Sequence, residues 1–410
     1  MRTYTHSARE TDARVAQPLE SNMKFSELYM DNAATSFPKP PGVREEISAF
    51  TDTVGASAGR GAYPKAQQTG SMIEETRQRC AHLLGIPDAT QLVFTFNASD
   101  SLNYAIHGIP WYPGDHAVIT MLEHNSVLRP MNHLIERVGI TVTKVPCSPE
   151  GYLSVDDVAR AITPKTKLVA VVHASNVIGV LTPVEEIAHL CRTKGIPLLI
   201  DAAQSAGSVP IDCQALGADM VAFPGHKALL GPQGTGGLYI RPGFDCVPLR
   251  QGGTGSISEQ ERQPDFYPDR FEAGSHNAHG LAGLHAALGY LAAKGIRAVR
   301  KHEQELTEYF LKGLARFNEV IVYGPKSAED RVAVVSINAV GFTPSALAEQ
   351  LYRRGAIMTR SGIHCAPVAH QTIGTYPTGT VRFSFGIFNT ISQIDRVLQT
   401  LKGILAQNHG

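Results

Sequence analysis

The sequence predicts an α/β fold in which a mainly parallel seven-stranded sheet, flanked by helices, is joined to a smaller α+β C-terminal domain. Three observations lead to this prediction. The chain has 410 residues, enough for two domains. Its middle alternates short apolar runs with helix-length amphipathic stretches, which is typical of a parallel sheet. After about residue 290, long helical patterns flank only two candidate strands, which indicates a second, smaller unit.

The elements of the main sheet are predicted from the positions of the apolar runs. The expected strands are Gln91–Thr95, His116–Thr120, Thr141–Val145, Leu168–His173, Pro197–Ile200, Met220–Phe223 and Gly237–Ile240. Helical patterns between them cover Gly70–Leu84, Val127–Val138, Val155–Ala161 and Pro183–Lys194. The smaller unit is expected to contain helices over Leu281–Ala293, Ala298–Ala315 and Ser345–Arg354 and strands over Val332–Ile337 and Thr380–Ser384.

These patterns divide the chain into three parts. Residues 1–22 are polar and are expected to be a flexible N-terminal extension. Residues 46–285 are assigned to the large domain. Residues 24–45 together with 286–410 are assigned to the small domain.

Composition narrows the classes of function. Hydrophobic residues make up 43% of the chain, charged residues 18%, and the formal net charge is zero. This balance favours a small neutral or zwitterionic ligand and gives no reason to expect nucleic acid or a membrane as a partner. The six cysteines are widely spaced without a CxxC pair, which predicts free thiols in a cytoplasmic protein and no metal site.

Several common ligand motifs are missing from the sequence. No GxGxxG follows a candidate strand, and HExxH is absent. The run Gly231–Gly237 is rich in glycine but lacks the Lys-Ser or Lys-Thr of a P-loop. A tight turn and a direct ligand contact both remain open for this run.

Two candidate strands end in ionisable side chains. The apolar run Leu198–Ile200 is followed by Asp201, and the strand Met220–Phe223 leads into a turn that ends at Lys227. Ligands bind at the carboxyl edge of open α/β sheets, where both residues are expected to lie. A carboxylate and an amine there supply what pyridoxal needs, a partner for its protonated ring nitrogen and an amine for its aldehyde. Taken alone, Asp201 could be a turn residue and Lys227 a surface lysine.

The sequence around these two residues resembles the class V aminotransferase family, which has the pyridoxal-phosphate fold type I. The resemblance rests on Asp-Ala-Ala-Gln-Ser from Asp201 and on Gly-His-Lys-Ala-Leu-Leu-Gly-Pro-Gln-Gly-Thr-Gly around Lys227. It extends from Tyr29-Met-Asp-Asn-Ala-Ala to about Asn389, and within the family it is strongest for cysteine desulfurases and selenocysteine lyases. The resemblance therefore implies pyridoxal 5′-phosphate as the cofactor.

The resemblance also implies roles for the residues around the cofactor ring. Lys227 would form the Schiff base, and Asp201 would pair with the ring nitrogen. Gln204 and Asn176 would contact the phenolic oxygen, Asn176 also touching the substrate. His124 would stack on the ring as a catalytic residue, although it could instead be an ordinary buried polar histidine.

A second set of implied roles concerns the phosphate. Ser99 and the backbone N–H of Ala98 would hold it at a helix N-terminus, although Ser99 could simply cap that helix. His226 would add a donor, or could be a satisfied polar histidine, and Ser275 would reach the phosphate from a partner subunit. Pro224 stands where many relatives carry a phosphate-binding serine or threonine, so some donors must come from elsewhere.

A third set concerns the amino-acid substrate. The segment Arg360-Ser-Gly-Ile-His-Cys365-Ala-Pro resembles the cysteine-bearing loop of the desulfurases, which makes Cys365 the implied nucleophile. Arg382, inside the strand Thr380–Ser384, would hold the substrate carboxylate with help from Arg360, or could form an internal salt bridge. Ala34 would contact the substrate, and Arg60 would reach the neighbouring subunit's site.

These roles imply a reaction and its partners. L-cysteine would become L-alanine while its sulfur passes to Cys365 as a persulfide and then to an acceptor protein or a small thiol. Family members are homodimers, so a homodimer is expected. A selenocysteine lyase, another cysteine β-lyase and a class V transaminase are the alternatives on the same scaffold. A non-catalytic scaffold protein is disfavoured because Lys227, Asp201 and Cys365 are all present.

Overall fold

The computed structural model describes residues 26–59 and 61–407. The predicted N-terminal extension, residues 1–22, and Arg60 lie outside these described residues, so both predictions remain as they stand.

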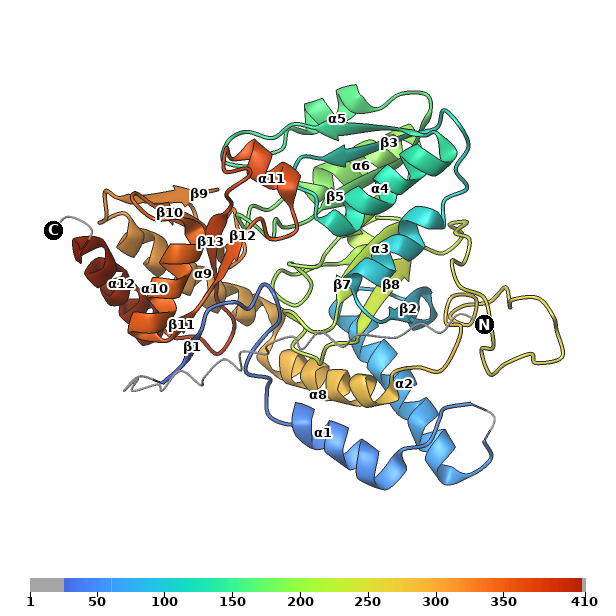
Figure 1. The fold of residues 1–410 in the computed structure, drawn as a ribbon. Helices are drawn as coiled ribbons and strands as arrows, with labels where there is room; N and C mark the ends of the chain where they lie inside the picture. Colours follow the sequence, from blue (N-terminus) through green and yellow to red (C-terminus); the bar gives the residue numbers. More distant parts are fainter. Residues whose placement is uncertain (1–25, 60, 408–410) are drawn as a thin grey trace, which may run out of the picture.

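A seven-stranded sheet forms the centre of the molecule (Figure 1). In spatial order its strands are β2 (Leu92–Thr95), β8 (Gly236–Ile240), β7 (Met220–Pro224), β6 (Leu198–Asp201), β5 (Thr166–Val172), β3 (His116–Thr120) and β4 (Thr141–Val145). Neighbours from β7 to β4 are parallel, whereas β8 is antiparallel to both β7 and β2. The predicted fold class is confirmed, and each of the seven expected strands is present within two residues at either end.

A hydrophobic cluster covers each face of the sheet. Because successive side chains of a strand point to opposite sides, one strand contributes residues to both clusters. Along β3, Val118 joins a hydrophobic cluster on one face, whereas Ala117 and Ile119 join the cluster on the other. The first cluster contains residues of α2, α6 and α8, and the second contains residues of α3 and α4. The inner strands are therefore largely apolar and buried, as the sequence indicated, whereas the edge strand β4 is mostly exposed.

Helices of the first three-quarters of the chain surround this sheet (Figure 1). They are α1 (Val43–Ala49), α2 (Pro64–Leu83), α3 (Ala98–His107), α4 (Asn125–Val138), α5 (Val155–Ala161), α6 (Val184–Lys194), α7 (Cys213–Leu216) and α8 (Ala278–Lys294), with a π-helical turn at Phe50–Val54 and a 3₁₀ turn at Ala89–Gln91.

A second, smaller sheet lies to one side with its own hydrophobic cluster (Figure 1). Its strand order is β12 (Arg360–Gly362), β13 (Thr380–Ser384), β10 (Val334–Ala339) and β9 (Val320–Tyr323), all antiparallel. The helices of this part are α9 (Ile296–Leu314), α10 (Pro344–Gly355), α11 (Pro367–Thr372) and α12 (Ile391–Ala406). The N-terminal strand β1 (Leu28–Tyr29) pairs with β11 (Ile357–Met358), so the start of the described chain joins its C-terminal part. The predicted domain limits are not tested by these contacts and stay a prediction.

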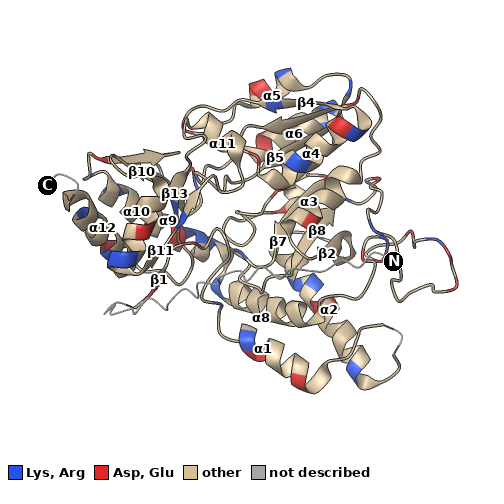
Figure 2. Ribbon diagram, in the orientation of Figure 1, with Lys and Arg blue, Asp and Glu red and all other residues tan. Residues whose placement is uncertain are grey.

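Charged side chains are spread over the molecule. Figure 2 shows Lys and Arg interspersed with Asp and Glu along the helices. Within the described residues, no helix is long and apolar enough to cross a membrane. Likewise, no group of three His, Cys, Asp or Glu side chains between residues 26 and 407, residue 60 apart, is arranged to hold a metal ion.

One buried carboxyl group lies directly beneath the edge of the main sheet. Glu123 follows β3 and is fully buried. Its Oε1 accepts hydrogen bonds from the Thr120 hydroxyl (2.7 Å) and the Val172 N–H (3.0 Å). Burial raises the pKa of this carboxyl from 4.5 to about 8, so the folded protein keeps it protonated at neutral pH.

Replacing this group should change how stability depends on pH. The unfolded chain loses the Glu123 proton above about pH 4.5, but the folded chain keeps it until about pH 8, so the unfolding free energy falls between these values. Glu123→Gln removes this titration and should flatten the decline by a few kcal/mol, since each pKa unit is worth about 1.4 kcal/mol. Urea unfolding at several pH values measures this change in the unfolding free energy. The exposed Glu136→Gln serves as the control, and an unchanged slope in Glu123→Gln would reject the assignment.

Candidate active site

Asp201 and Lys227 lie at the same edge of the main sheet. Asp201 is the last residue of β6, and Lys227 follows the end of the adjacent parallel strand β7 by three residues. The register places Asp201 opposite Ala222 of β7. Both side chains line one cavity of about 520 Å³. Asp201 and Lys227 therefore lie together at the carboxyl edge of the sheet, as the sequence predicted.

The Asp201 carboxyl is buried in this cavity. Asp201 is only 3% exposed, and its Oδ1 accepts a hydrogen bond from the N–H of Ala203 at 2.9 Å. Burial raises the pKa of Asp201, while that hydrogen bond and the charge of Lys227 act in the opposite direction. A buried carboxylate is costly without a cationic or hydrogen-bonding partner, so this group is suited to bind a protonated donor in the cavity.

The Lys227 amine is shifted towards its neutral form. Burial lowers its pKa from 10.5 to about 8. The charge of Asp201 opposes this shift, whereas Arg382 and Arg360 reinforce it. A neutral amine is the nucleophilic form, and at pH 7.5 a pKa of about 8 makes it roughly two orders of magnitude more abundant than in an ordinary lysine.

Other predicted site residues line the same cavity. They come from the ends of several strands: Ala98 and Ser99 after β2, His124 after β3, Asn176 after β5, Gln204 after β6, and His226 after β7. Most of the residues assigned to the cofactor therefore lie at this one edge of the sheet. The Gln204 amide donates to the Ala33 carbonyl at 3.0 Å, which fixes the start of the chain against this edge.

The N-terminus of α3 faces the cavity. The Asn97 side chain caps the helix by accepting the Asp100 N–H at 2.9 Å. The N–H groups of Ala98 and Ser99 lie in the first turn, where no intrahelical acceptor exists, and are suited to an anion. Thus Asn97, and not Ser99, is the capping residue.

Ser126 extends this group of donors and was not selected from the sequence. Its hydroxyl lies 2.5 Å from the Ser99 hydroxyl and 2.9 Å from Nδ1 of His124. It also lines the cavity. The contact between Ser99 and Ser126 joins the first turn of α3 to the first turn of α4.

The two histidines of the cavity are neutral. Burial, followed by the charge of Lys227, lowers the pKa of both His124 and His226 to about 4. His124 Nδ1 accepts the Ser126 N–H at 3.1 Å. Within the described residues, His226 Nδ1 is buried without a hydrogen-bond partner, so it is available to a bound group.

Cys365 lies on a strained turn beside this edge. It follows β12, and both His364 (φ 50°) and Cys365 (φ 58°) adopt the left-handed conformation, which costs about 1 kcal/mol or more for a non-glycine residue. The turn is held because the Asn125 N–H donates to the Cys365 carbonyl (2.7 Å) and the Asn176 amide donates to the His364 carbonyl (2.6 Å). The strain places an exposed thiol next to the cavity.

A wide cleft of about 1010 Å³ connects Cys365 to the cavity. Cys365 lines this cleft, and three further lining residues, Ser99, His124 and Ser126, also line the cavity of Lys227. The thiol therefore faces a space that is continuous with the wall of the Lys227 site.

Arg382 forms the internal salt bridge that the sequence left open. It is 1% exposed, its Nη2 donates to Asp31 Oδ1 at 2.7 Å, and its Nη1 donates to the Asn176 carbonyl at 3.0 Å. Among the described residues its buried Nε has no partner. Asp31 was missed as a site residue because its pairing joins residues 351 positions apart, although it lies in the Tyr-Met-Asp-Asn motif.

Arg360 and Ala34 lie beside this pair. Arg360 in β12 is the cross-strand neighbour of Arg382 in β13 and is exposed. The Ala34 N–H donates to the Asp31 carbonyl at 3.0 Å. Three of the four residues assigned to the substrate are thus connected through Asp31 and the pairing of two short strands, and Arg382 also donates to the carbonyl of the fourth, Asn176.

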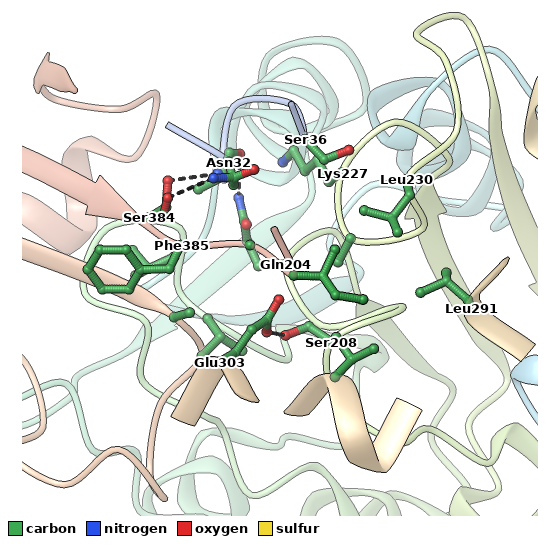
Figure 3. A pocket seen from close by; sticks show the side chains of 18 residues that line it. Asn32, Ser36, Gln204, Ser208, Lys227, Leu230, Leu291, Glu303, Ser384 and Phe385 are labelled. Carbon is green, nitrogen blue, oxygen red and sulfur yellow. Dashed lines mark hydrogen bonds between the residues drawn. The ribbon is translucent and has the colours of Figure 1, made fainter. Parts of the chain in front are cut away.

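A second cavity of about 490 Å³ also contacts Lys227 and Gln204 (Figure 3). It is lined by both the large-sheet edge and residues next to the small sheet. Figure 3 shows Glu303 hydrogen-bonded to Ser208 within it. Burial raises the pKa of Glu303 to about 7. This carboxyl was not selected from the sequence, where it is one of several glutamates along a helix.

Comparison with known proteins identifies the family. The family model described as "Aminotransferase class-V" matches residues 28–397. The chain belongs to the class V aminotransferases. Members of this family depend on pyridoxal phosphate.

The relatives within this family are cysteine desulfurases. The chain is 33% identical to a probable cysteine desulfurase of Methanothermobacter thermautotrophicus, covering 92% of this chain and 94% of that protein. It is 35% identical to one of Pyrococcus abyssi, with the same two shares. The apo structure of the cysteine desulfurase from Thermococcus onnurineus NA1 superposes with a TM-score of 0.88 at 34% identity, covering 93% of this chain and 95% of that one.

The cavity fits the cofactor of a class V aminotransferase. It offers a buried carboxylate and an amine shifted towards neutrality at adjacent strand ends. It also offers unpaired helix N–H groups beside two serine hydroxyls, and an unpartnered buried His226 nitrogen. The amine matches an aldehyde, the carboxylate accepts a hydrogen bond from a protonated ring nitrogen, and the N–H and hydroxyl donors match a phosphate.

Ser275 does not join this site within one chain. It lines a separate cavity of about 390 Å³ with Phe94–Phe96 and Arg250. Lys227 and Asp201 are not among the residues of that cavity. A contact of Ser275 with the phosphate therefore requires a second subunit and remains a prediction.

Removing the Asp201 charge should lower the pKa of the Lys227 amine below about 8, because the carboxylate stabilises the ammonium form. We expect competitive acetylation of the cofactor-free enzyme, followed by peptide mass spectrometry across pH, to give a midpoint near 8. In Asp201→Asn the midpoint should be lower. The exposed Lys194 in the same digest is the internal reference. A midpoint near the ordinary 10.5 for Lys227 would contradict the described environment.

Proposed function

We propose that this enzyme is a cysteine desulfurase that converts L-cysteine to L-alanine and takes up the sulfur on Cys365. The observation that carries the proposal is an exposed thiol on a strained turn, in a cleft that adjoins the cavity of Lys227 and Asp201. The names of the relatives, which are cysteine desulfurases, support the same reaction.

The residues of the cavity would prepare the substrate for this reaction. When bound, pyridoxal phosphate supplies an aldehyde that binds the amino group and an electron-poor ring that withdraws electrons from the α-carbon. The Asp201 carboxylate would accept the proton-bearing ring nitrogen and keep it protonated. The Lys227 amine, whose pKa is lowered to about 8, would take the α-proton in its neutral form. The neutral His124 ring would lie against the cofactor face.

Arg382 would bind the substrate carboxylate. Its Nη2 is held by Asp31 and its Nη1 by the Asn176 carbonyl, which leaves the unpartnered Nε and the remaining N–H of Nη2 as a two-donor edge. Such an edge matches a carboxylate in a bidentate arrangement. Arg360, the exposed cross-strand neighbour, would add a second positive charge, and Ala34 would contact the substrate from the N-terminal segment.

Cys365 would carry out the sulfur transfer. Its thiolate attacks the substrate sulfur, an S–S bond forms, and the Cβ–S bond breaks with its electron pair remaining on Cβ. Cβ then takes a proton, the proton taken up by Lys227 returns to the α-carbon, and the product is alanine. The sulfur stays on Cys365 as a persulfide until a thiol of an acceptor protein or a small molecule removes it.

We also propose that the phosphate site is completed in a homodimer. Pro224 ends β7 and has neither a hydroxyl nor an N–H, so it cannot donate to the phosphate. Ser99 and Ser126 supply hydroxyls at the helix N-terminus, and His226 supplies its unpartnered nitrogen. Ser275 of a second subunit would complete the set, because it lies in a separate cavity of its own chain.

Replacing the nucleophile tests the proposed reaction. Cys365→Ser should keep the visible absorption of the bound cofactor but lower the rate of alanine formation from L-cysteine about 100-fold or more, because the sulfur has no thiolate to receive it. Alanine and sulfide are measured with and without a reducing thiol. Cys147→Ser, at a half-buried cysteine, is the control and should form alanine and sulfide at the wild-type rates.

Three outcomes would contradict the proposal. Unchanged alanine formation in Cys365→Ser would mean that sulfur leaves without the thiol, as in a β-lyase, and retained turnover of selenocysteine alone would favour a selenocysteine lyase. Formation of a stable pyridoxamine form that needs a keto acid would indicate a transaminase.

A further inference from the structure

The cleft in front of Cys365 has a wall that extends beyond the cofactor cavity. Asn103 and His107 come from α3, and Arg129 and His133 from α4, and none of these four lines the cavity of Lys227. Among the described residues, the lining is Ser99, Asn103, His107, His124, Asn125, Ser126, Arg129, Pro130, His133 and Cys365. None of these lining residues carries a carboxylate, so an anion that enters the cleft meets no repelling side chain from this part of the chain.

Arg129 is the permanent positive charge of this wall. It is exposed on α4, and it forms no ion pair or hydrogen bond with any of the residues that the structure describes. Its charge contributes to lowering the pKa of His124, so its field reaches the inner end of the cleft. An arginine without an acidic partner on a carboxylate-free wall is available to bind a ligand anion.

The two outer histidines line the cleft together with the arginine. The rings of His107 and His133 meet edge to face with centroids 5.8 Å apart. Burial, followed by the charge of His133, lowers the pKa of His107, which keeps that ring neutral at pH 7. Among the described residues that line this wall, Arg129 is the one guanidinium or ammonium group, and its positive charge does not depend on pH near neutrality.

We propose that this cleft selects sulfur acceptors that carry a carboxylate near their thiol, with Arg129 as the specificity-determining residue. The inference rests on the proposed desulfurase function, because it concerns the discharge of the Cys365 persulfide. Arg129 binds the acceptor carboxylate while the acceptor sulfur lies against the exposed sulfur of Cys365. A neutral thiol of the same size enters the same cleft but lacks this contact.

The transfer step is balanced without an oxidant or a reductant. The acceptor thiolate attacks the outer sulfur of the persulfide and forms a new S–S bond, and the bond between that sulfur and Cys365 breaks. Cys365 leaves as a thiolate, and the proton lost by the acceptor thiol passes to solvent. The enzyme is then ready for another turnover, and away from the enzyme a second acceptor thiol reduces the acceptor persulfide to hydrogen sulfide and forms the acceptor disulfide.

The expected size of the preference follows from the exposure of Arg129. Exposed ion pairs are weak, so the charge of Arg129 should favour an anionic reagent about two- to fivefold. Because the pair is exposed to solvent, the preference should decrease as ionic strength rises.

The first test measures the cleft without any turnover. Cys365 is the exposed cysteine among six, so its alkylation by iodoacetate and by iodoacetamide can be followed by peptide mass spectrometry of the cofactor-loaded enzyme. A change in the reactivity of the thiol itself alters both rates equally, so it cancels in the ratio of the two rates. Arg129→Gln should lower the iodoacetate-to-iodoacetamide ratio about two- to fivefold. Arg137→Gln, an exposed arginine of the same helix that does not line the cleft, should leave the ratio unchanged.

The second test measures acceptor choice during turnover. Alanine formation from L-cysteine is followed with 3-mercaptopropionate or with its neutral analogue 3-mercaptopropan-1-ol as the acceptor. The wild-type enzyme should have the higher kcat/KM for the carboxylate-bearing thiol, and Arg129→Gln should reduce that preference by the same two- to fivefold while the neutral thiol reacts as before. Arg137→Gln again serves as the control.

The outcomes separate the two proposals. A thiol preference that is the same in Arg129→Gln and the wild type overturns the acceptor inference, even if the alkylation ratio changes. An unchanged alkylation ratio overturns the role of Arg129 as the anion-binding side chain. Absence of alanine with every thiol rejects the desulfurase function and the acceptor inference with it, and the alkylation ratio then still reports whether the cleft attracts anions.

Discussion

The site depends on the fact that the carboxyl ends of neighbouring parallel strands meet at one edge of a sheet. Backbone hydrogen bonds between β6 and β7 fix the backbone positions of Asp201 and Lys227. No contact between the two side chains is therefore needed to bring them into one cavity. Burial then acts on both groups, raising the pKa of the acid and lowering that of the amine. The same low-polarity edge that makes these groups costly makes them useful for binding a charged ring and an aldehyde.

The smaller sheet brings the remaining chemistry to this edge through contacts with the backbone. The carbonyl of Cys365 accepts the N–H of Asn125, and the carbonyl of His364 accepts the amide of Asn176. Arg382 in turn donates to the carbonyl of Asn176. Because two of these three contacts are made by Asn176 at the end of β5, the position of the thiol and of the arginine relative to Lys227 is set by one short loop. Such anchoring explains how a left-handed turn can be maintained at two non-glycine residues.

Much of the fold and part of the site could be predicted from local patterns. Alternation of apolar runs and helices identified the strands of the main sheet, and a strand-end position identified Asp201 and Lys227 because periodicity and motif lie within a few residues. Asp31 and Ser126 could not be found in this way. The ion pair of Asp31 with Arg382 and the contact of Ser126 with Ser99 each join distant segments, and neither leaves a signal in the surrounding residues. Helix α12 was also missed, although its capping box at Thr390 and Gln393 was a usable local signal.

The most direct test of the site is to find which lysine binds the cofactor. The loaded enzyme is reduced with borohydride, digested, and the pyridoxyl group is located by mass spectrometry. Lys39 is the informative competitor, because burial lowers its pKa to about 8 as well, but its Nζ is held by Ser36 (2.8 Å) and the His226 carbonyl (3.0 Å). The sheet-edge geometry predicts the label on Lys227. A label on Lys39, or no stable label on any lysine, would contradict it.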